Sequence, residues 1–267
     1  MQKRASQWLI PVILAVGAAL ALWYYWVSMS GPVLTPVDTL PPAAELPAEI
    51  LRPLHPVDDV DPVELPATSL VPLPPLDKSD DYFKLEITDI FGDTIASMLV
   101  EAGIIQRVVA TVDNLPRAHV SEKVRPVGRL AAPFLVDEQD GSGEYTVSVS
   151  NYQRYDQMIS SLTKADMTAV AGLYRRFYPL FQRAYVDLGY PDGYFNDRLV
   201  EVIDHLLETP EVSGPIELVL PHVLYEYADP DLEALSSGQK LLLRLGPDHA
   251  GQVKVSLREL RMLVTTM

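Results

Sequence analysis

Residues 31–78 constrain the fold of this chain more than any other stretch, because twelve of its 23 prolines fall there. Proline fixes φ and removes a backbone donor, so neither a helix nor a sheet can extend through the stretch. It also holds eight acidic residues against only Arg52 and Lys78 as basic ones, and like charges extend a chain. We predict a semi-rigid spacer without a binding role. Proline-rich recognition motifs are the alternative.

The spacer separates an apolar N-terminal segment from the rest of the chain. Residues 8–29 carry no charge, and about 22 residues at a helical rise of ~1.5 Å are long enough to cross a bilayer core of ~30 Å. We therefore predict a single transmembrane helix that contacts the lipid bilayer. Aromatic rings typical of membrane interfaces lie at its two ends, namely those of Trp8, Trp23, Tyr24, Tyr25 and Trp26.

The charges around this segment predict its orientation. Lys3 and Arg4 precede it, and the next basic residue is Arg52. The positive-inside rule then places the N-terminal tail in the cytoplasm and the chain after Ser30 on the other side of the membrane. The alternative is a cleaved signal peptide, because residues 19–21 loosely match a cleavage site, although the apolar run exceeds the ~7–15 residues of such signals.

The remaining residues contain no second spacer, so the chain divides into three parts. We predict a tail and anchor in residues 1–30, the spacer in 31–78 and one folded domain in 79–267. The net charge of −15 without a Lys/Arg-rich run argues against a nucleic acid partner. Because the chain has no cysteine, disulfides, thiolate nucleophiles and cysteine metal sites are excluded. No cofactor and no metal site are predicted.

Apolar residues recur at three- and four-residue steps in several parts of the domain, which is the pattern of amphipathic helices. Helices are predicted over residues 85–100, over 104–115 and over a C-terminal stripe that ends at Val264. Two inward faces are predicted in the middle of the domain: Val170, Leu173, Phe177, Phe181, Ala184 and Leu188 in one helix, and Phe195, Leu199, Val202 and Leu206 in the next. Pro179 falls opposite the first face.

Strand signals are fewer. Two β-rich runs within residues 134–149 surround a polar Asp-Gly-Ser-Gly turn, which predicts a β-hairpin. The run at residues 216–230 is apolar and β-branched but contains Pro221, so we predict an extended segment at a sheet edge. The predicted fold class is α+β, a predominantly α-helical globular domain with one β-hairpin, behind a single N-terminal transmembrane helix and a Pro-rich linker.

Two motifs suggest chemistry but are better explained by structure. Ser237 and Lys240 fit the S-x-x-K pattern of penicillin-binding proteins, yet no S-D-N or K-T-G partner motif occurs. We predict that Ser237 caps a helix. Glu201 and His205 lack the second histidine of a zinc-binding helix, and we predict an exposed i,i+4 pair. No catalytic residue is assigned.

Long runs of the sequence resemble a known bacterial family. They are "VDNLPR" at residues 112–117, "NYQRYD" at 151–156, the run at 173–210 and the run at 224–247. Together they are similar to the family catalogued as domain of unknown function 3014. The resemblance implies a proteobacterial envelope protein with an anchor, a spacer and one C-terminal domain, without an established activity. With the charge rule, it indicates the bacterial inner membrane, with a cytoplasmic N-terminus and a periplasmic C-terminal domain.

The stretch at residues 175–198 holds the candidate binding surface. Once its apolar rings are assigned to the core, and its prolines and glycines to backbone shape, seven polar residues remain: Arg175, Arg183, Tyr190, Asp192, Tyr194, Asp197 and Arg198. They can either join the two helices through hydrogen bonds and ion pairs, which we favour, or line an open binding surface. Lys254, Arg258 and Arg261 form a basic stripe on the last helix, which we expect to be solvated or paired with acids of the domain.

The sequence supports three functional hypotheses. The first is a non-enzymatic binding or scaffold module of the cell envelope, whose partner is an envelope protein or a cell-wall component. The second is a cell-wall hydrolase that uses paired carboxylates, with Asp192, Asp197, Glu201 and Glu226 as candidates. The third is a domain that only oligomerises. Sequence alone gives no distance between any two of these groups.

Overall fold

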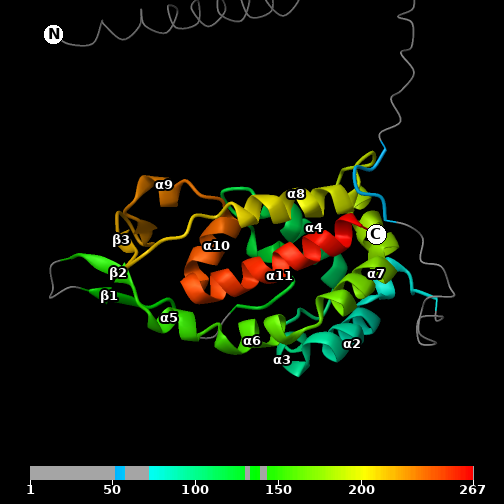
Figure 1. The fold of residues 1–267 in the computed structure, drawn as a ribbon, viewed down its shortest axis with the longest axis horizontal. Coiled ribbons are helices and arrows are strands. Elements are labelled where there is room, and N and C mark those ends of the chain that lie inside the picture. Colours follow the sequence, from blue (N-terminus) through cyan, green and yellow to red (C-terminus); the bar gives the residue numbers. More distant parts are fainter. Residues whose placement is uncertain (1–51, 58–71, 130–132, 139–142, 267) are drawn as a thin grey trace, which may run out of the picture. The chain divides into compact units, whose positions relative to one another are not determined.

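The computed structural model describes residues 52–57, 72–129, 133–138 and 143–266 (Figure 1). These residues belong to one compact unit. Residues 8–29, with the aromatic rings predicted at the membrane interfaces, lie outside the described residues. Within the described ranges, no helix combines the length and the apolarity needed to cross a membrane. The predicted anchor stays a prediction.

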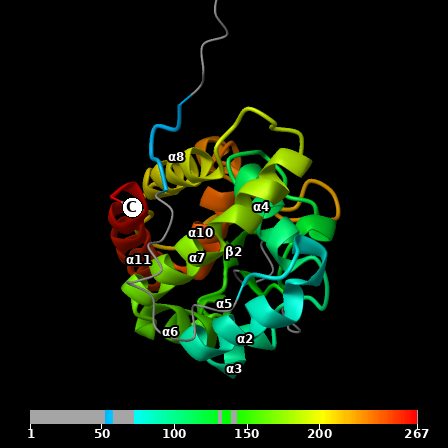
Figure 2. The ribbon, with the colours of Figure 1, turned by 90° about the vertical axis from the view of Figure 1, so that its right-hand side faces the viewer.

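The helix α7 (Met167–Asp187) is the centre of the domain. It contacts α2 (Asp80–Phe91), α4 (Ile104–Asn114), α8 (Phe195–Leu207) and α11 (Pro247–Thr265), which surround it in the view of Figure 2. The carboxylate of Asp166 accepts a hydrogen bond from the backbone N–H of Thr168 at 2.8 Å and begins this helix. The polar stretch at 175–198 therefore extends from the central helix α7 into the first turn of α8.

The inward face predicted for α7 is largely confirmed. Leu173, Phe177, Phe181 and Ala184 are buried in the main core cluster, and Pro179 lies on the exposed side of the helix as predicted. Leu188 is different, because its side chain is 42% exposed. It is the residue after the last helical turn, so the helical period no longer fixes its direction. The prediction of a core position for Leu188 was wrong.

The helix predicted over residues 85–100 is broken at Gly92. This glycine has a φ of 79°, which only glycine adopts readily, and a short helix α3 (Asp93–Ala96) follows it. The helix predicted over 104–115 is confirmed as α4. Its first turn is held by Asp80 of α2, whose carboxylate accepts the N–H groups of Gly103 and Ile104, both at 2.8 Å.

A small antiparallel sheet lies at one end of the helical body (Figure 1), with the strand order β1-β2-β3-β4. The predicted hairpin is confirmed as β1 (Val136–Glu138) and β2 (Tyr145–Val147). The strand β3 (Glu217–Val219) pairs with β2 on one side and with β4 (Glu226–Tyr227) on the other. The prediction of a sheet edge within residues 216–230 is confirmed for β4, whereas β3 is an interior strand, and Pro221 falls in the loop between the two.

Short elements complete the fold. They are the 3-10 helices η2 (Leu76–Lys78) and η3 (Glu122–Val124) and the α-helices α5 (Ser150–Gln153), α6 (Asp156–Lys164), α9 (Pro230–Glu233) and α10 (Ser237–Leu245). Leu73 and Leu76 pack against the main core cluster. The folded domain therefore begins before residue 79, inside the stretch predicted as spacer. Its class is confirmed as mostly helical with a small sheet.

The residue that begins α10 also differs from the prediction. Ser236 accepts the N–H of Gln239, and the side chain of Gln239 accepts the N–H of Ser236, which is a capping box. The hydroxyl of Ser237 instead donates to the carbonyl of Ala118 at 2.9 Å, and Lys240 pairs with Glu233 of α9. Ser237 and Lys240 thus have separate structural partners.

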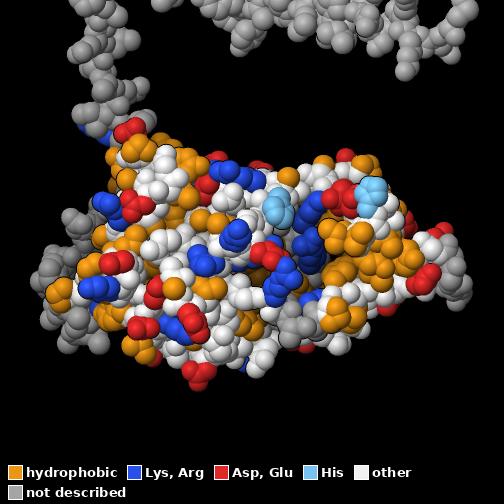
Figure 3. Space-filling model, turned by 180° about the vertical axis from the view of Figure 1, so that it is seen from behind, with side chains coloured by type: hydrophobic (Ala, Val, Ile, Leu, Met, Phe, Trp, Pro, Cys, Tyr) orange, Lys and Arg blue, Asp and Glu red, His pale blue; other side chains and the backbone are white. Residues whose placement is uncertain are grey.

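Apolar side chains gather at the sheet end of the domain, at the right of Figure 3. The loop between β3 and β4 contributes Val223 and Leu224, whose side chains are 89% and 76% exposed. These side chains therefore do not contribute to the core.

Candidate functional site

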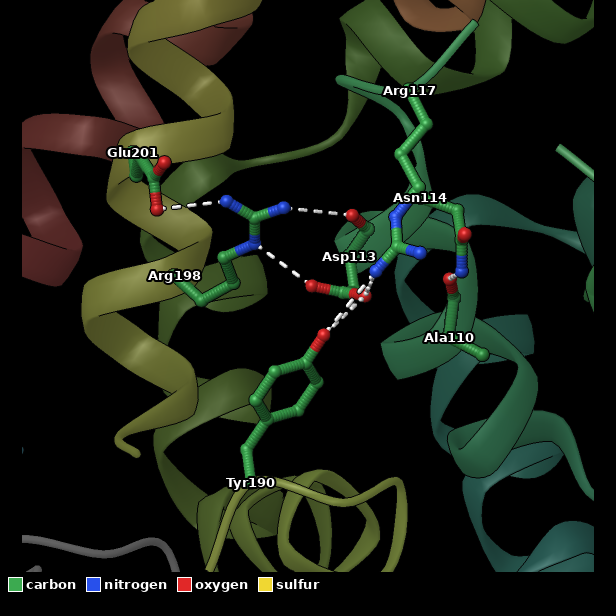
Figure 4. A network of polar contacts seen from close by, with 7 residues as sticks. All are labelled: Ala110, Asp113, Asn114, Arg117, Tyr190, Arg198 and Glu201. Atoms are coloured by element: carbon green, nitrogen blue, oxygen red, sulfur yellow. Dashed lines mark hydrogen bonds and ion pairs between the residues drawn. The ribbon is translucent and has the colours of Figure 1, made fainter. Parts of the chain in front are cut away.

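The buried carboxylate of Asp113 in α4 joins three segments of the chain (Figure 4). Asp113 is 3% exposed. Arg198 of α8 donates from Nε to Oδ1 at 3.0 Å and from Nη2 to the backbone carbonyl of Asp113 at 2.8 Å. Arg117 and the hydroxyl of Tyr190 donate to Oδ2 at 2.8 and 3.2 Å. We call these residues, together with Glu201, the Asp113 network.

The arginine of α8 has a second acidic partner within the network. Arg198 also pairs with Glu201 at 2.8 Å. Burial lowers the pKa of the Arg198 guanidinium, but the contacts with Glu201 and Asp113 act in the opposite direction, and the net effect raises it. The ring of Tyr190 stacks on Tyr185 with centroids 4.6 Å apart. Tyr190 and Arg198 therefore fasten α4, α8 and the end of α7 together, which is the reading that the sequence favoured.

The other predicted surface residues do not join this network. Arg183 pairs with Asp187 at the surface, at 3.1 Å. Arg175 is half-buried, and its Nε has no hydrogen-bond partner among the described residues. Asp192 is exposed in the turn before α8, and Tyr194 is the residue that precedes the first turn of α8. The seven residues thus do not form one open surface.

Asp197 takes part in a different arrangement, in which the chain holds part of its own spacer. Its carboxylate accepts the backbone N–H groups of Leu54 and His55 at 3.0 and 2.7 Å. The neighbouring Asn196 donates from Nδ2 to the carbonyl of His55 at 2.9 Å. We call Asn196 and Asp197 the clamp. The prediction of a spacer without a binding role therefore does not hold for Leu54 and His55.

Asn196 is fully buried, and both the oxygen and the nitrogen of its side-chain amide form hydrogen bonds. Its Oδ1 accepts the hydroxyl of Tyr174 at 3.1 Å, and its Nδ2 also donates to the carbonyl of Val264 at 2.9 Å. Val264 lies in the last turn of α11, where carbonyls lack helical partners. The clamp is thus built on the junction of α7, α8 and the end of α11.

A glutamine of α7 positions the clamp. Gln182 accepts the N–H of Phe195 at 2.8 Å and donates to the carbonyl of Gly193 at 2.7 Å. Gln182 also accepts a hydrogen bond from the hydroxyl of Tyr178 at 3.1 Å. Burial raises the pKa of Tyr178 to about 12. The hydrogen bonds of Gln182 replace the missing cap at the start of α8, because the side chain of the residue before the helix makes no capping hydrogen bond.

Sequence reasoning missed Asp113, Gln182 and Asn196. All three are polar residues that a pattern places on helices, but only their partners in other elements reveal that they are buried and bonded. Only a weak feature of the sequence pointed to the clamp. Asn196 and Asp197 occupy the first turn of a predicted helix, where acidic and amide side chains often serve as local caps.

A comparison with protein-family models matches residues 104–261 to the family described as protein of unknown function, DUF3014. The match covers more than half of the chain. The chain belongs to the DUF3014 family. No curated protein and no solved structure matches it. The matched part of the DUF3014 domain extends from α4 into α11 and contains both the Asp113 network and the clamp, whereas residues 52–57 precede it.

Several of the remaining candidate groups of the DUF3014 domain have structural partners. His205 shares a hydrogen bond of 2.8 Å with the hydroxyl of Ser236, so the predicted pair with Glu201 was wrong. In the basic stripe of α11, Arg261 pairs with Asp204, whereas Lys254 is buried rather than solvated. Within the described ranges, no group of three or more His, Cys, Asp or Glu side chains could hold a metal ion.

Proposed function

We propose that this chain is a single-pass inner-membrane protein of the bacterial cell envelope, and that its periplasmic domain is a non-enzymatic binding module. The uncharged residues 8–29 and the preceding Lys3 and Arg4 support the anchor and its orientation. The clamp supports the binding role. Its ligand class is a bent protein segment with flanking prolines, which makes an envelope protein the partner.

The clamp carries this proposal because it recognises a backbone rather than side chains. A single carboxylate accepts two successive N–H groups, and the adjacent amide donates to the carbonyl that follows them. Hydrogen bonds to an ionised acceptor are shorter and stronger than neutral ones. Any chain that bends in the same way at this position can offer the same three groups.

The bound segment is bent at Leu54 and His55, and its sequence restricts the residues on both sides of the bend. Residues 53–56 read Pro-Leu-His-Pro, so the two paired N–H groups lie between prolines that fix φ near the polyproline value. A segment whose backbone is already restricted by proline loses less entropy when it binds. A partner segment with the same spacing of prolines would suit the clamp equally well.

The segment bound in the structure belongs to the chain itself, and this sets the condition for a partner. A short tether keeps residues 52–57 at an effective concentration near the millimolar range. A partner segment therefore has to displace it. We expect the intact chain to bind such a segment weakly and a chain with a vacated clamp to bind it well.

The test uses the full chain in detergent micelles. Residues 52–57 are replaced by a Gly/Ser sequence of equal length, and a fluorescent peptide that covers residues 50–59 is added. We expect saturable binding to the vacated chain and at least about tenfold weaker binding after Asp197→Asn is added. Asp192→Asn is the matched control, because Asp192 is exposed a few residues away. Absence of peptide binding to the vacated chain rejects the proposal.

An activity assay distinguishes the binding module from the alternative, a cell-wall hydrolase that uses paired carboxylates. The full chain is incubated with peptidoglycan and glycans, and the soluble products are analysed. The binding proposal predicts no fragments. Release of fragments that disappears in Asp192→Asn or Asp197→Asn would replace it with the hydrolase.

A further inference from the structure

A cavity of about 260 Å³ opens between the N-terminal half of α11, the end of α10 and the loop that follows α8. Its inner wall is formed by the buried side chains of Ile216, Leu242 and Leu243. Its outer part is formed by residues 210–214, which are mostly exposed. This cavity shares no residue with the clamp or with the Asp113 network, so its role is independent of the proposed function.

A buried lysine lines this otherwise apolar wall. Lys254 is 6% exposed, and its Nζ donates to the carbonyl of Thr209 at 2.6 Å. Among the described residues it makes no ion pair. Thr209 follows the end of α8, so the partial negative charge of that helix end offsets part of the lysine charge. A neutral carbonyl satisfies one of the three N–H groups of an ammonium and leaves the others available.

A buried charge without a counter-charge is costly, and most proteins pair it. Here the space beside the ammonium is a cavity rather than a packed wall. A glycine helps to keep it open: a methyl group on Gly251 of α11 would meet nothing within 4 Å. The geometry therefore leaves room for an anion next to Lys254.

We propose that this cavity, which we call the Lys254 cavity, binds a small organic monocarboxylate with an apolar body. The carboxylate pairs with Lys254 and the apolar part contacts Leu242, Leu243 and Ile216. Lys254 is the single cationic residue among the described residues that line the cavity, and Glu211 lines it as well. One positive charge with a carboxylate nearby matches a singly charged anion better than a phosphate dianion.

The size of the cavity limits the ligand further. Pockets for drug-sized molecules have volumes of roughly 300–1,000 Å³, so a cavity of about 260 Å³ suits a smaller molecule. A branched acid of a few carbons has the required combination of one charge and a compact apolar group. Isovalerate is a suitable probe, and isovaleramide is its uncharged counterpart of nearly equal shape.

The test measures binding of these probes to the full chain by calorimetry and by NMR shifts of the amides of residues 211–214 and 250–254. We expect isovalerate to bind with a dissociation constant of about 1 mM or tighter, and isovaleramide and inorganic phosphate to bind at least about tenfold more weakly. Lys254→Met removes the charge and keeps the volume, so it should abolish the preference for the acid over the amide. Glu211→Gln, at the exposed rim, should preserve it.

A second variant keeps the test valid if Lys254→Met does not fold. Gly251→Leu places a side chain in the open space of the cavity and should block isovalerate binding while the folded domain persists. The proposal is overturned if isovalerate causes no saturable change up to about 50 mM, well above the expected dissociation constant. It is also overturned if the amide or phosphate binds as tightly as the acid, or if Gly251→Leu leaves binding unchanged.

Discussion

Arg198 holds Asp113 at two points, since it bonds both the carboxylate and the backbone carbonyl of the same residue at 3.0 and 2.8 Å. The first contact neutralises a carboxylate that is almost fully buried. The second occupies a carbonyl near the end of α4, where helical partners are missing. One side chain therefore joins α4 to α8 and completes the end of a helix.

Removing Arg198 should destabilise the domain strongly. Arg198→Leu leaves the Asp113 carboxylate buried with Arg117 and Tyr190 as its remaining partners, and loss of one partner of a buried pair typically costs about 3–5 kcal/mol. We expect a loss near the lower end, about 3 kcal/mol, in urea unfolding. The double variant Asp113→Leu with Arg198→Leu should recover a large part of it, because no lone charge remains.

Arg183→Leu is the matched control for this measurement. Arg183 forms an exposed i,i+4 pair with Asp187, with side chains 68% and 48% exposed, and such pairs contribute less than about 0.5 kcal/mol. Equal losses in Arg198→Leu and Arg183→Leu would contradict the view that the Asp113 network fastens the helices.

The hydroxyl of Tyr190 should contribute less than the arginine. Tyr190→Phe keeps the ring that stacks on Tyr185 and removes the hydrogen bond to Asp113. A typical net loss is about 1 kcal/mol, measured in the same urea assay. Tyr225→Phe is the control, because the Tyr225 hydroxyl has no hydrogen bond within the described part of the chain. A loss in Tyr190→Phe no larger than in this control would show that the bond is not formed in solution.

Periodicity predicted the parts of the fold that depend on one element at a time. The inward faces of α7 and α8 repeat every three or four residues, and Phe177, Phe181, Phe195 and Val202 are indeed buried. The hairpin turn was also local. What periodicity did not predict was the interior position of β3, because pairing with β2 and β4 depends on strands that are far away in the sequence.

The candidate site was harder to predict for the same reason. Tyr190 and Arg198 were identified as residues that join helices, but their common partner Asp113 lies 77 and 85 residues away. The partners of Asp197 lie farther away still, 142 and 143 residues earlier. Composition indicated that residues 31–78 cannot propagate a helix or sheet, but it did not indicate that Leu54 and His55 bind to α8.

The pair of Asp204 and Arg261 should make stability depend on pH in the acid range. The hydrogen bond from Arg261 lowers the pKa of the Asp204 carboxyl below its ordinary value of 3.8, and the charge of His55 adds a smaller effect of the same sign. The folded state therefore keeps the carboxylate ionised at a pH where the unfolded state takes up a proton. This stabilisation is complete above the ordinary pKa and is lost as pH falls through the lowered one.

Thermal unfolding of the full chain and of Asp204→Asn between pH 7 and pH 2 tests this dependence. The melting temperature of the variant should lie below that of the parent at pH 5–7, and the difference should shrink as pH falls below about 4. Glu259→Gln, an exposed acid of the same helix as Arg261, should show no such convergence. A difference that stays constant down to pH 2 would exclude the ion pair as its source.

Gly246, between α10 and α11, is predicted to be the glycine least tolerant of substitution among those described. Its φ of 84° and ψ of 164° lie in a region that other residues almost never occupy, and a methyl group there would lie 2.6 Å from the ring of Tyr152. Gly246→Ala should therefore cost more than about 2 kcal/mol of unfolding free energy in urea. Gly251→Ala, a few residues later inside α11 with open space around it, should increase the unfolding free energy by up to about 1 kcal/mol.

Adding Tyr152→Ala to Gly246→Ala removes the steric part of the loss but not the backbone part, so the losses of the two substitutions should be less than additive. Strict additivity would mean that the glycine is required for its conformation alone and that the ring of Tyr152 does not restrict it.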